Sequence, residues 1–242
     1  LAGRELPAAR LAALLQSAER RFVGTPCGIM DMMTAIVGRP SCALRLDCRS
    51  LRFEAIPLPA SITMLLVDTG VRHALGSSDY GRRRAEVEQA SAALGVSSLR
   101  DADLELVERA ALPDALRRRA RHVVREIARV DRAVAALRSD DAAELGRIVS
   151  ASHASLRDDF DVSVPEVDRV VELALRADPG VLGARMVGGG FGGAVLVVAS
   201  SSRVDHVERS LRELGLAAPP HSIRRVRPGA GYTASVVEEL PS

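Results

Sequence analysis

The chain contains no lysine and no tryptophan, and aromatic residues are few, with four phenylalanines and two tyrosines among 242 residues. All 33 basic residues are therefore arginines, and 31 acidic residues leave a formal net charge of +2. Proteins that bind nucleic acid or anionic membranes usually carry an excess of basic charge. This balance gives no reason to expect either partner.

Cysteine is also scarce. The odd set of Cys27, Cys42 and Cys48 has no C-x-x-C spacing, which suits a reducing compartment better than a disulfide framework. No apolar stretch approaches the length of a membrane span, and no stretch has the pattern of a secretory leader. We therefore expect a cytoplasmic protein. Its length suffices for one large domain or two small ones.

Apolar periodicity predicts both helices and strands in the first part of the chain. Leu11 to Phe22 show a helical period, and Gly28 to Val37 predict a second helix that ends near Gly38. Residues 43–47 and 52–56 are typical of a hairpin, and residues 62–68 are apolar enough for a buried strand.

The second part of the chain is expected to be mainly helical, with strands near its end. Residues 114–137 carry an apolar stripe that we expect to lie in the core, and Ser163 to Glu166 have the spacing of a capping box. Residues 194–199 and 222–227 predict strands on either side of a helix between Ser202 and Gly215. This order favours an α+β sandwich.

A carboxylate stands beside a glycine in Pro26-Cys27-Gly28-Ile29-Met30-Asp31. Asp31 would lie in the first turn of its helix, where the helix dipole favours a negative charge. Two interpretations stay open at this point. Asp31 is either an ordinary acidic residue at a helix start or a functional carboxylate.

A run of glycines occupies Gly188-Gly189-Gly190-Phe191-Gly192-Gly193. Gly188, Gly190 and Gly193 satisfy G-x-G-x-x-G, but a dinucleotide fingerprint needs a helix after the glycines, and an apolar strand pattern follows here. We expect a loop whose glycines let backbone N–H groups approach an anion. A tight turn packed under a helix is the alternative.

Tyr80 lies in a polar segment, Ser77 to Arg84, just past the predicted buried strand. Its ring could pack on the apolar face of a sugar while the hydroxyl bonds to a ring substituent. Simple packing at a helix start is the other interpretation. His122 and His153 are expected to be structural.

Several blocks, in one order along the chain, together resemble the galactokinase family of the GHMP small-molecule kinases. The blocks are Phe22 to Asp31, Leu46 to Leu51, Val71 to Leu75 with Ser78 and Tyr80, Arg119 to Val124, Ser152 to Phe160, and the glycine run. The resemblance covers the C-terminal two-thirds of that family. It implies ATP-dependent phosphorylation of the anomeric C1 hydroxyl of galactose in a cleft between two domains.

The resemblance also implies domains and residue roles. Residues 1–60 would be a remnant of the N-terminal GHMP kinase domain, and residues 61–242 a C-terminal domain with a ferredoxin-like sandwich. Asp31 matches the catalytic aspartate, as base or orienter, and Gly28, Asp31 and Tyr80 match sugar contacts. The positions matching the motif near the nucleotide phosphates are Gly188, Gly189, Gly190, Gly192 and Gly193.

Two departures from the family pattern are visible. Met32 replaces a usual glutamine, and the N-terminal motifs that would hold Mg²⁺, most of the ATP and most sugar hydroxyls have no counterpart. We therefore expect a monomeric fragment that is inactive alone and has no metal ligands of its own. A kinase for arabinose, N-acetylgalactosamine or a heptose, or a non-catalytic sugar sensor, stays open as an alternative.

Overall fold

The computed structural model describes residues 6–24, 27–71, 77–219 and 221–232. They form two compact units: the described residues of Leu1–Pro57 and Arg227–Ser242 make up the first, and those of Leu58–Val226 the second. The boundary lies close to the expected one after residue 60. Residues 227–232, which the sequence had grouped with the second domain, pack with the first unit. The assignment of residues 1–60 and 61–242 to two kinase domains stays a prediction.

The first unit contains two helices and a hairpin. Helices α1 (Ala8–Phe22) and α2 (Met30–Val37) pack on each other, and β1 (Cys42–Leu46) pairs with β2 (Phe53–Pro57). Both strands lie within one residue of their predicted bounds, whereas α2 begins two residues later and α1 three residues earlier than predicted. The apolar face of α1 is largely open in the structure, because Leu14 is 49% and Phe22 86% exposed.

Residues after the last strand close the first unit. The amide of Tyr232 donates to the carbonyl of Ala35 over 2.7 Å, and the amide of Gly231 donates to the carbonyl of Gly38 over 2.7 Å. A Cβ on Gly231 would lie 2.4 Å from the carbonyl oxygen of Ile36, so only glycine allows this approach. The end of α2 is thereby fixed by a segment almost two hundred residues away.

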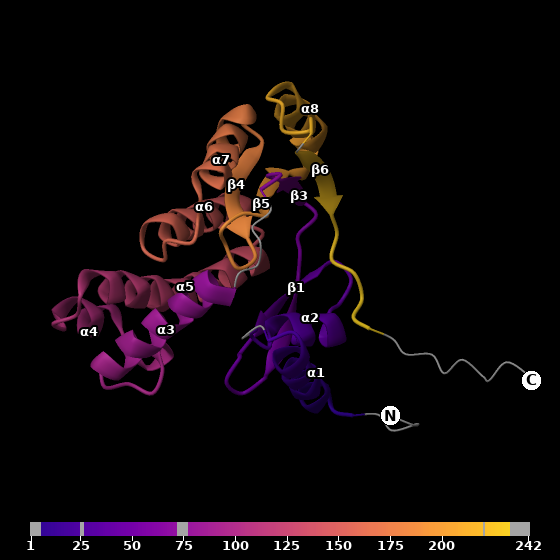
Figure 1. Cartoon of the computed structure of the whole chain (residues 1–242). Coiled ribbons are helices and arrows are strands. Elements are labelled where there is room, and N and C mark those ends of the chain that lie inside the picture. Colours follow the sequence, from indigo (N-terminus) through magenta and orange to yellow (C-terminus); the bar gives the residue numbers. More distant parts are fainter. Residues whose placement is uncertain (1–5, 25–26, 72–76, 220, 233–242) are drawn as a thin grey trace, which may run out of the picture. The chain divides into compact units, whose positions relative to one another are not determined.

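The second unit is built on a four-stranded antiparallel sheet (Figure 1). Its strands are β3 (Ile62–Asp68), β4 (Val181–Val187), β5 (Ala194–Ser200) and β6 (Ser222–Val226), in the order β4-β5-β3-β6. Helices separate β3 from β4 and β5 from β6, whereas β4 and β5 form a hairpin. This succession is the ferredoxin-like β-α-β-β-α-β arrangement, as expected.

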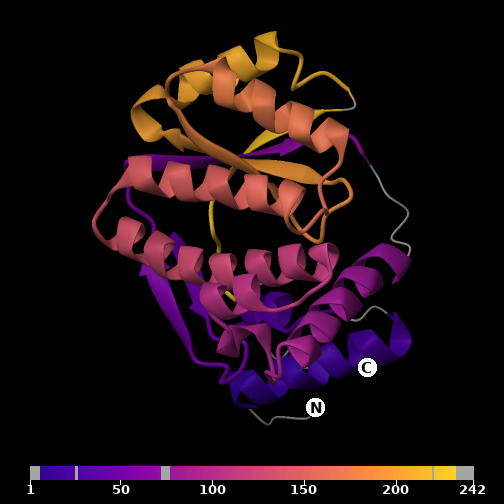
Figure 2. The ribbon, with the colours of Figure 1, turned by 90° about the vertical axis from the view of Figure 1, so that its left-hand side faces the viewer.

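Helices cover both faces of this sheet. The helices of this unit are α3 (Ser77–Ala93), η1 (Leu99–Asp101), α4 (Leu104–Arg109), α5 (Asp114–Arg138), α6 (Ala142–Asp158), α7 (Pro165–Ala177), η2 (Ser201–Arg203) and α8 (Val204–Glu213). Of these, α3, η1 and α4 pack against α5. Figure 2 shows α7 and α8 on one face and α6, backed by α5, on the other. Side-chain packing on β5 agrees with this arrangement: Val197 packs with α7 and α8 on one face, and Val198 packs with α5 and α6 on the other.

The apolar stripe of α5 is buried only in part. Ala120 packs with α3 and η1, and Ala136 packs with α6 and the sheet, but Ile127 is 41% and Val130 50% exposed. The prediction that the whole stripe is core was therefore wrong at Ile127 and Val130. The helix is long enough for its two ends to enter separate hydrophobic clusters, and the residues between them have less to pack against.

Two details differ from the sequence-based expectations. The hydroxyl of Ser163 donates to Asp168 Oδ1 over 2.5 Å instead of capping α7, which starts with Val164 as its N-cap. Strand β4 is not predicted from the sequence, because Gly183 and Arg185 interrupt its apolar pattern. Within the described residues, no helix combines the length and apolarity that crossing a membrane requires.

Helix α6 and strand β4 touch through their backbones. An ideal Cβ on Gly146 would lie 2.0 Å from the carbonyl oxygen of Leu182, and one on Gly183 would lie 2.2 Å from the carbonyl oxygen of Gly146. Both glycines are thus required by the close approach of a helix to a strand. Any side chain here would push α6 away from the sheet.

We predict that Gly146→Ala lowers the free energy of unfolding by about 3 kcal/mol, the upper range for overpacking a core. Gly81→Ala is the matched control, because Gly81 is also helical but an added Cβ there meets nothing within 4 Å. That variant should gain about 0.5 to 1 kcal/mol from helix propensity. Urea denaturation measures both, and equal effects in the two variants would contradict the contact.

Candidate functional site

Asp31 lies in the first turn of α2 and is exposed to solvent. Gly28, two residues before the helix, is also exposed, and a Cβ there would meet nothing within 4 Å. No side chain caps the helix, so the carboxylate of Asp31 supplies the negative charge at its N-terminus. Both residues belong to the first unit.

The segment that leads into α2 is fastened to α1. The carbonyl oxygen of Cys27 accepts hydrogen bonds from Gln16 Nε2 at 3.2 Å and from Arg20 Nη2 at 2.8 Å. Met33, on the opposite side of α2 from solvent, is fully buried. These contacts set the position of the first turn and hence of the Asp31 carboxylate.

The glycine run forms the turn between β4 and β5 in the second unit. Gly188, Gly190, Gly192 and Gly193 all have positive φ, and so does Phe191 with φ of 60°. Four of these five conformations would strain most L-residues, which explains why glycine occupies them. We call residues 188–193 the glycine loop.

Backbone contacts hold the glycine loop at both ends of its curve. The amide of Phe191 donates to the carbonyl of Val162 over 2.7 Å, and a Cβ on Gly190 would lie 2.5 Å from that same oxygen. The carbonyl of Gly193 accepts from the amide of Thr69 at 2.9 Å and from its hydroxyl at 2.6 Å. Thr69 is buried, so this anchor belongs to the folded core of the unit.

The outer part of the glycine loop is open. Gly188 and Gly189 are exposed, and within the described residues their N–H groups meet no protein acceptor. Gly188 and Gly190 have positive φ and Gly189 between them does not, and successive amides of such a turn can converge on an anion. The loop therefore has the chemistry to bind phosphate oxygens through its backbone.

Tyr80 lies beside the glycine loop. It occupies the first turn of α3, is 40% exposed, and places its Cδ2 atom 3.7 Å from the ideal Cβ position of Gly189. The structure thus brings together Tyr80 and the glycine loop, which the sequence singled out separately. A half-exposed ring at the edge of the glycine loop can contact a ligand with its face or its hydroxyl.

Comparisons with known proteins find relatives of this chain. Residues 133–216 match the family described as GHMP kinases C terminal. The chain is 47% identical over 205 residues to the galactokinase of Bos taurus, and the alignment covers 84% of this chain and 52% of that protein. The galactokinase of Streptomyces coelicolor is 44% identical over 221 residues, covering 87% of this chain and 57% of that protein. The chain is homologous to galactokinases.

The solved structures agree with this relationship. A galactokinase from Lactococcus lactis, crystallised with galactose, superposes with a TM-score of 0.88 at 30% identity, covering 95% of this chain and 62% of that one. A mevalonate kinase from L. major, with a TM-score of 0.58 at 21% identity, shares the fold. The expected resemblance and the α+β GHMP kinase fold are confirmed. The chain spans about half the length of the curated galactokinases it matches.

Two histidines in the blocks shared with the galactokinase family are buried in the second unit. The amide of Met186 donates to His153 Nδ1 at 3.4 Å, which leaves the proton on Nε2, 3.3 Å from Asp168 Oδ1. Burial lowers the pKa of His153, although the negative charge of Asp168 acts to raise it. Its contacts are internal, in keeping with a structural role.

His122 is the more strongly shifted group. Its Nδ1 lies 3.0 Å from Ser155 Oγ, whose own proton goes to Asp159 Oδ2 at 3.1 Å, so Nδ1 must donate. Its ring stacks on Phe160 with centroids 4.4 Å apart. Burial lowers the pKa of His122 to about 4, although the charges of Glu126 and Asp159 act to raise it.

Sequence reasoning missed the partners that hold the glycine loop. Val162 and Thr69 act through backbone atoms or a small hydroxyl, and they lie about 30 and 120 residues from the loop. No local pattern marks such contacts. For metal ions, the described residues contain no cluster of three or more His, Cys, Asp or Glu side chains.

We predict that Gly190→Ala destabilises the protein by at least about 1 kcal/mol more than Gly188→Ala does. Both variants carry the strain of a positive φ, but only at Gly190 does the new Cβ strike the Val162 carbonyl. Urea denaturation of the two variants measures the difference. Equal losses would show that Val162 does not restrict the loop.

The pKa of His122 predicts a pH dependence of stability. A folded pKa of about 4 against 6.5 when unfolded means that the unfolded chain binds the proton more tightly. The free energy of unfolding should therefore fall by about 3 kcal/mol on this account as the pH drops from about 6.5 to 4. In His122→Asn, which keeps a donor near Nδ1, the slope from pH 7 to 5 should be smaller. Parallel curves for both proteins would contradict this assignment.

Proposed function

We propose that this chain is part of a galactokinase, which transfers the γ-phosphate of ATP to the anomeric C1 hydroxyl of galactose. The observation that carries the proposal is the homology to galactokinases over 84% of the chain, together with the TM-score of 0.88 to a galactokinase crystallised with galactose. We also propose that it acts in the cytoplasm as a monomer, on a free sugar and ATP.

In this proposal Asp31 acts on the hydroxyl that attacks the phosphate. Its exposed carboxylate can accept the C1 hydroxyl proton or hold that hydroxyl in line for attack, a role consistent with its open position in the first turn of α2. Gly28 precedes it by three residues and would leave room for the sugar, because an added Cβ there meets nothing within 4 Å.

The glycine loop would receive the phosphates of ATP. The exposed amides of Gly188 and Gly189 suit phosphate oxygens, and Gly190, Gly192 and Gly193 give the backbone the curvature that presents them. Transfer of a phosphoryl group depends mainly on positioning and charge stabilisation, which such amides supply. Tyr80 would meet the sugar at the edge of the loop, with its hydroxyl as the hydrogen-bonding group.

Mg²⁺ enters the proposal only as a requirement of the reaction. Since the described residues hold no cluster of carboxylates or histidines suited to a metal ion, we assign it no ligand in this chain. No step of the mechanism above depends on its position.

The test is formation of galactose-1-phosphate from ATP and galactose by the protein expressed from the full reading frame that contains this chain. Asp31→Asn should lower kcat by about 10²- to 10⁴-fold, because an amide neither takes the proton nor carries the charge. Asp114→Asn is the matched control, as Asp114 also lies in the first turn of a helix and its side chain is 81% exposed. It should leave kcat unchanged.

Three results would count against the proposal. Phosphorylation of arabinose, N-acetylgalactosamine or a heptose in preference to galactose would indicate a related kinase. Sugar binding without turnover would indicate a sensor. Equal losses in Asp31→Asn and Asp114→Asn would show that the charge at a helix start matters only for folding.

A further inference from the structure

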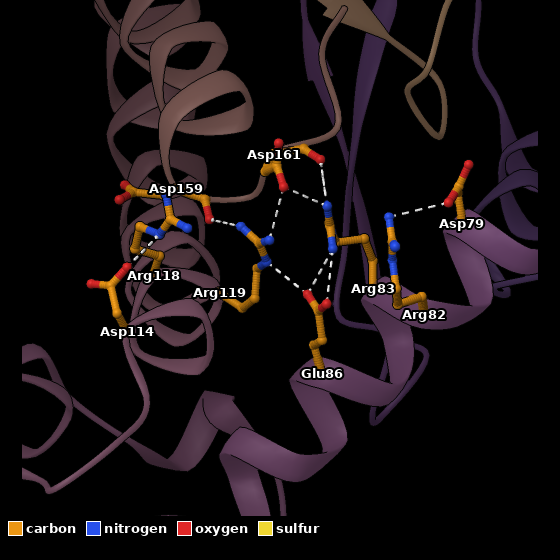
Figure 3. A network of polar contacts seen from close by, with 9 residues as sticks. All are labelled: Asp79, Arg82, Arg83, Glu86, Asp114, Arg118, Arg119, Asp159 and Asp161. Carbon is orange, nitrogen blue, oxygen red and sulfur yellow. Dashed lines mark hydrogen bonds and ion pairs between the residues drawn. The ribbon is translucent and has the colours of Figure 1, made fainter.

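Two buried arginines and two carboxylates form a compact cluster at the junction of α3, α5 and the segment between α6 and α7 (Figure 3). Arg83 and Arg119 are only 4% and 3% exposed. Glu86 Oε2 lies 2.8 Å from Arg83 Nη1 and 2.8 Å from Arg119 Nε. Asp161 Oδ2 lies 2.6 Å from Arg83 Nη2 and 3.0 Å from Arg119 Nη2. We call these four residues the arginine cluster.

The remaining donors of the arginine cluster go to backbone carbonyls of the same segment. Arg119 Nη1 donates to the carbonyl of Asp159 at 2.6 Å, and Arg83 Nη2 donates to the carbonyl of Asp161 at 2.8 Å. The guanidinium groups thus bind the carbonyls of Asp159 and Asp161 and also the carboxylate of Asp161. Asp161 is held with φ of 57°, a conformation that few residues adopt without such support.

The next residue, Val162, supports the glycine loop. Val162 is buried, and its carbonyl accepts the amide of Phe191 while blocking any side chain at Gly190. The position of that carbonyl follows from the backbone of Asp161. A single peptide unit therefore connects Asp161 of the arginine cluster to Val162, whose carbonyl contacts the glycine loop.

The arginine cluster also shares a helix with the residue on the other flank of the glycine loop. Arg83 follows Tyr80 by three residues on α3, so both lie on the same side of that helix. Tyr80 borders Gly189. The loop is consequently bordered by two groups, Val162 and the Tyr80 ring, and the arginine cluster bridges the elements that carry them.

An ionic cluster of this kind is a costly way to obtain stability alone. The two arginines and Glu86 are largely removed from water and lose hydration that their attraction to the carboxylates only offsets, whereas the Asp161 side chain is 57% exposed. An apolar set of similar volume often stabilises a protein as well. Burial acts to raise the pKa of Glu86, but the hydrogen bond from Arg119 and the charge of Arg83 hold it below its ordinary value. Glu86 is thus held in its ionised form, and the guanidinium donors impose directions that apolar contacts lack.

We propose that Arg83, Glu86, Arg119 and Asp161 are positioning residues for the glycine loop: they hold the Val162 carbonyl and the Tyr80 turn in the places that shape the loop. The assignment of nucleotide phosphates to that loop rests on the proposed function. The positioning itself does not.

Hydrogen exchange on the 242-residue chain tests the positioning. In Glu86→Gln the new amide group points a donor at two guanidinium groups, and Asp161→Asn loses the charge while asparagine still accepts positive φ. We expect exchange of the Phe191 amide to become at least about tenfold faster in both variants, relative to the Val197 amide in the central strand β5. Glu88→Gln and Asp158→Asn, whose side chains are 64% and 60% exposed, are the matched controls and should change neither rate.

Two outcomes would overturn the inference: equal acceleration at Phe191 and Val197, which would mean a purely structural role, or no acceleration at Phe191. In the longer protein, Glu86→Gln should also raise the KM for ATP several-fold with a smaller change in kcat, and an unchanged KM would count against a link to the phosphates. A protein that does not phosphorylate galactose would leave the exchange result intact, so the two proposals can fail separately.

Discussion

The hydrogen bond from the Phe191 amide to the Val162 carbonyl governs the geometry of the candidate phosphate site. At 2.7 Å it ties the turn of one hairpin to the segment between two helices, and it passes through a space that only Gly190 leaves open. A loop of glycines would otherwise sample many conformations, because glycine gives up more backbone freedom on folding than any other residue. One backbone acceptor, rigidly placed, removes much of that freedom before any ligand arrives, which lowers the cost of binding.

That acceptor needs support of its own, and the chain supplies it with arginine in addition to the apolar packing of the Val162 side chain in the core. A guanidinium group has five N–H donors in one plane, so Arg83 and Arg119 can each hold a carboxylate and a carbonyl at once. Lysine, which the sequence lacks entirely, could not fix directions in this way. His122 adds to the same segment through its stacking on Phe160 and its bond to Ser155. Charge and aromatic contact therefore converge on a stretch of about five residues.

The periodicity of apolar residues predicted those helices and strands whose position depends on neighbouring residues in the chain. The strand over residues 62–68 and the long helix from Asp114 were found to within one residue, since uninterrupted periodicity over many positions leaves one solution. The prediction that the apolar stripe of α5 is buried was wrong at Ile127 and Val130. Periodicity shows which residues share a face of a helix, but not whether another element packs against that face. Asp31, Tyr80 and the glycine loop could be named from their types and order. Contacts such as that of Arg119 with Asp161 could not, as they join elements that only the tertiary fold brings together.

Asp31 depends on a different kind of support from the glycine loop. Its helix has eight residues and buries a single large side chain, Met33, so packing alone would leave it poorly fixed. Hydrogen bonds to two backbone carbonyls hold it instead: the carbonyl of Cys27, before its first turn, accepts from the Arg20 side chain, and that of Ala35, near its last turn, accepts from a backbone amide. The second of these comes from Tyr232, beyond the final strand. The carboxylate proposed to act on the sugar is thus oriented by both ends of the described chain, and neither end reveals this role through its own sequence.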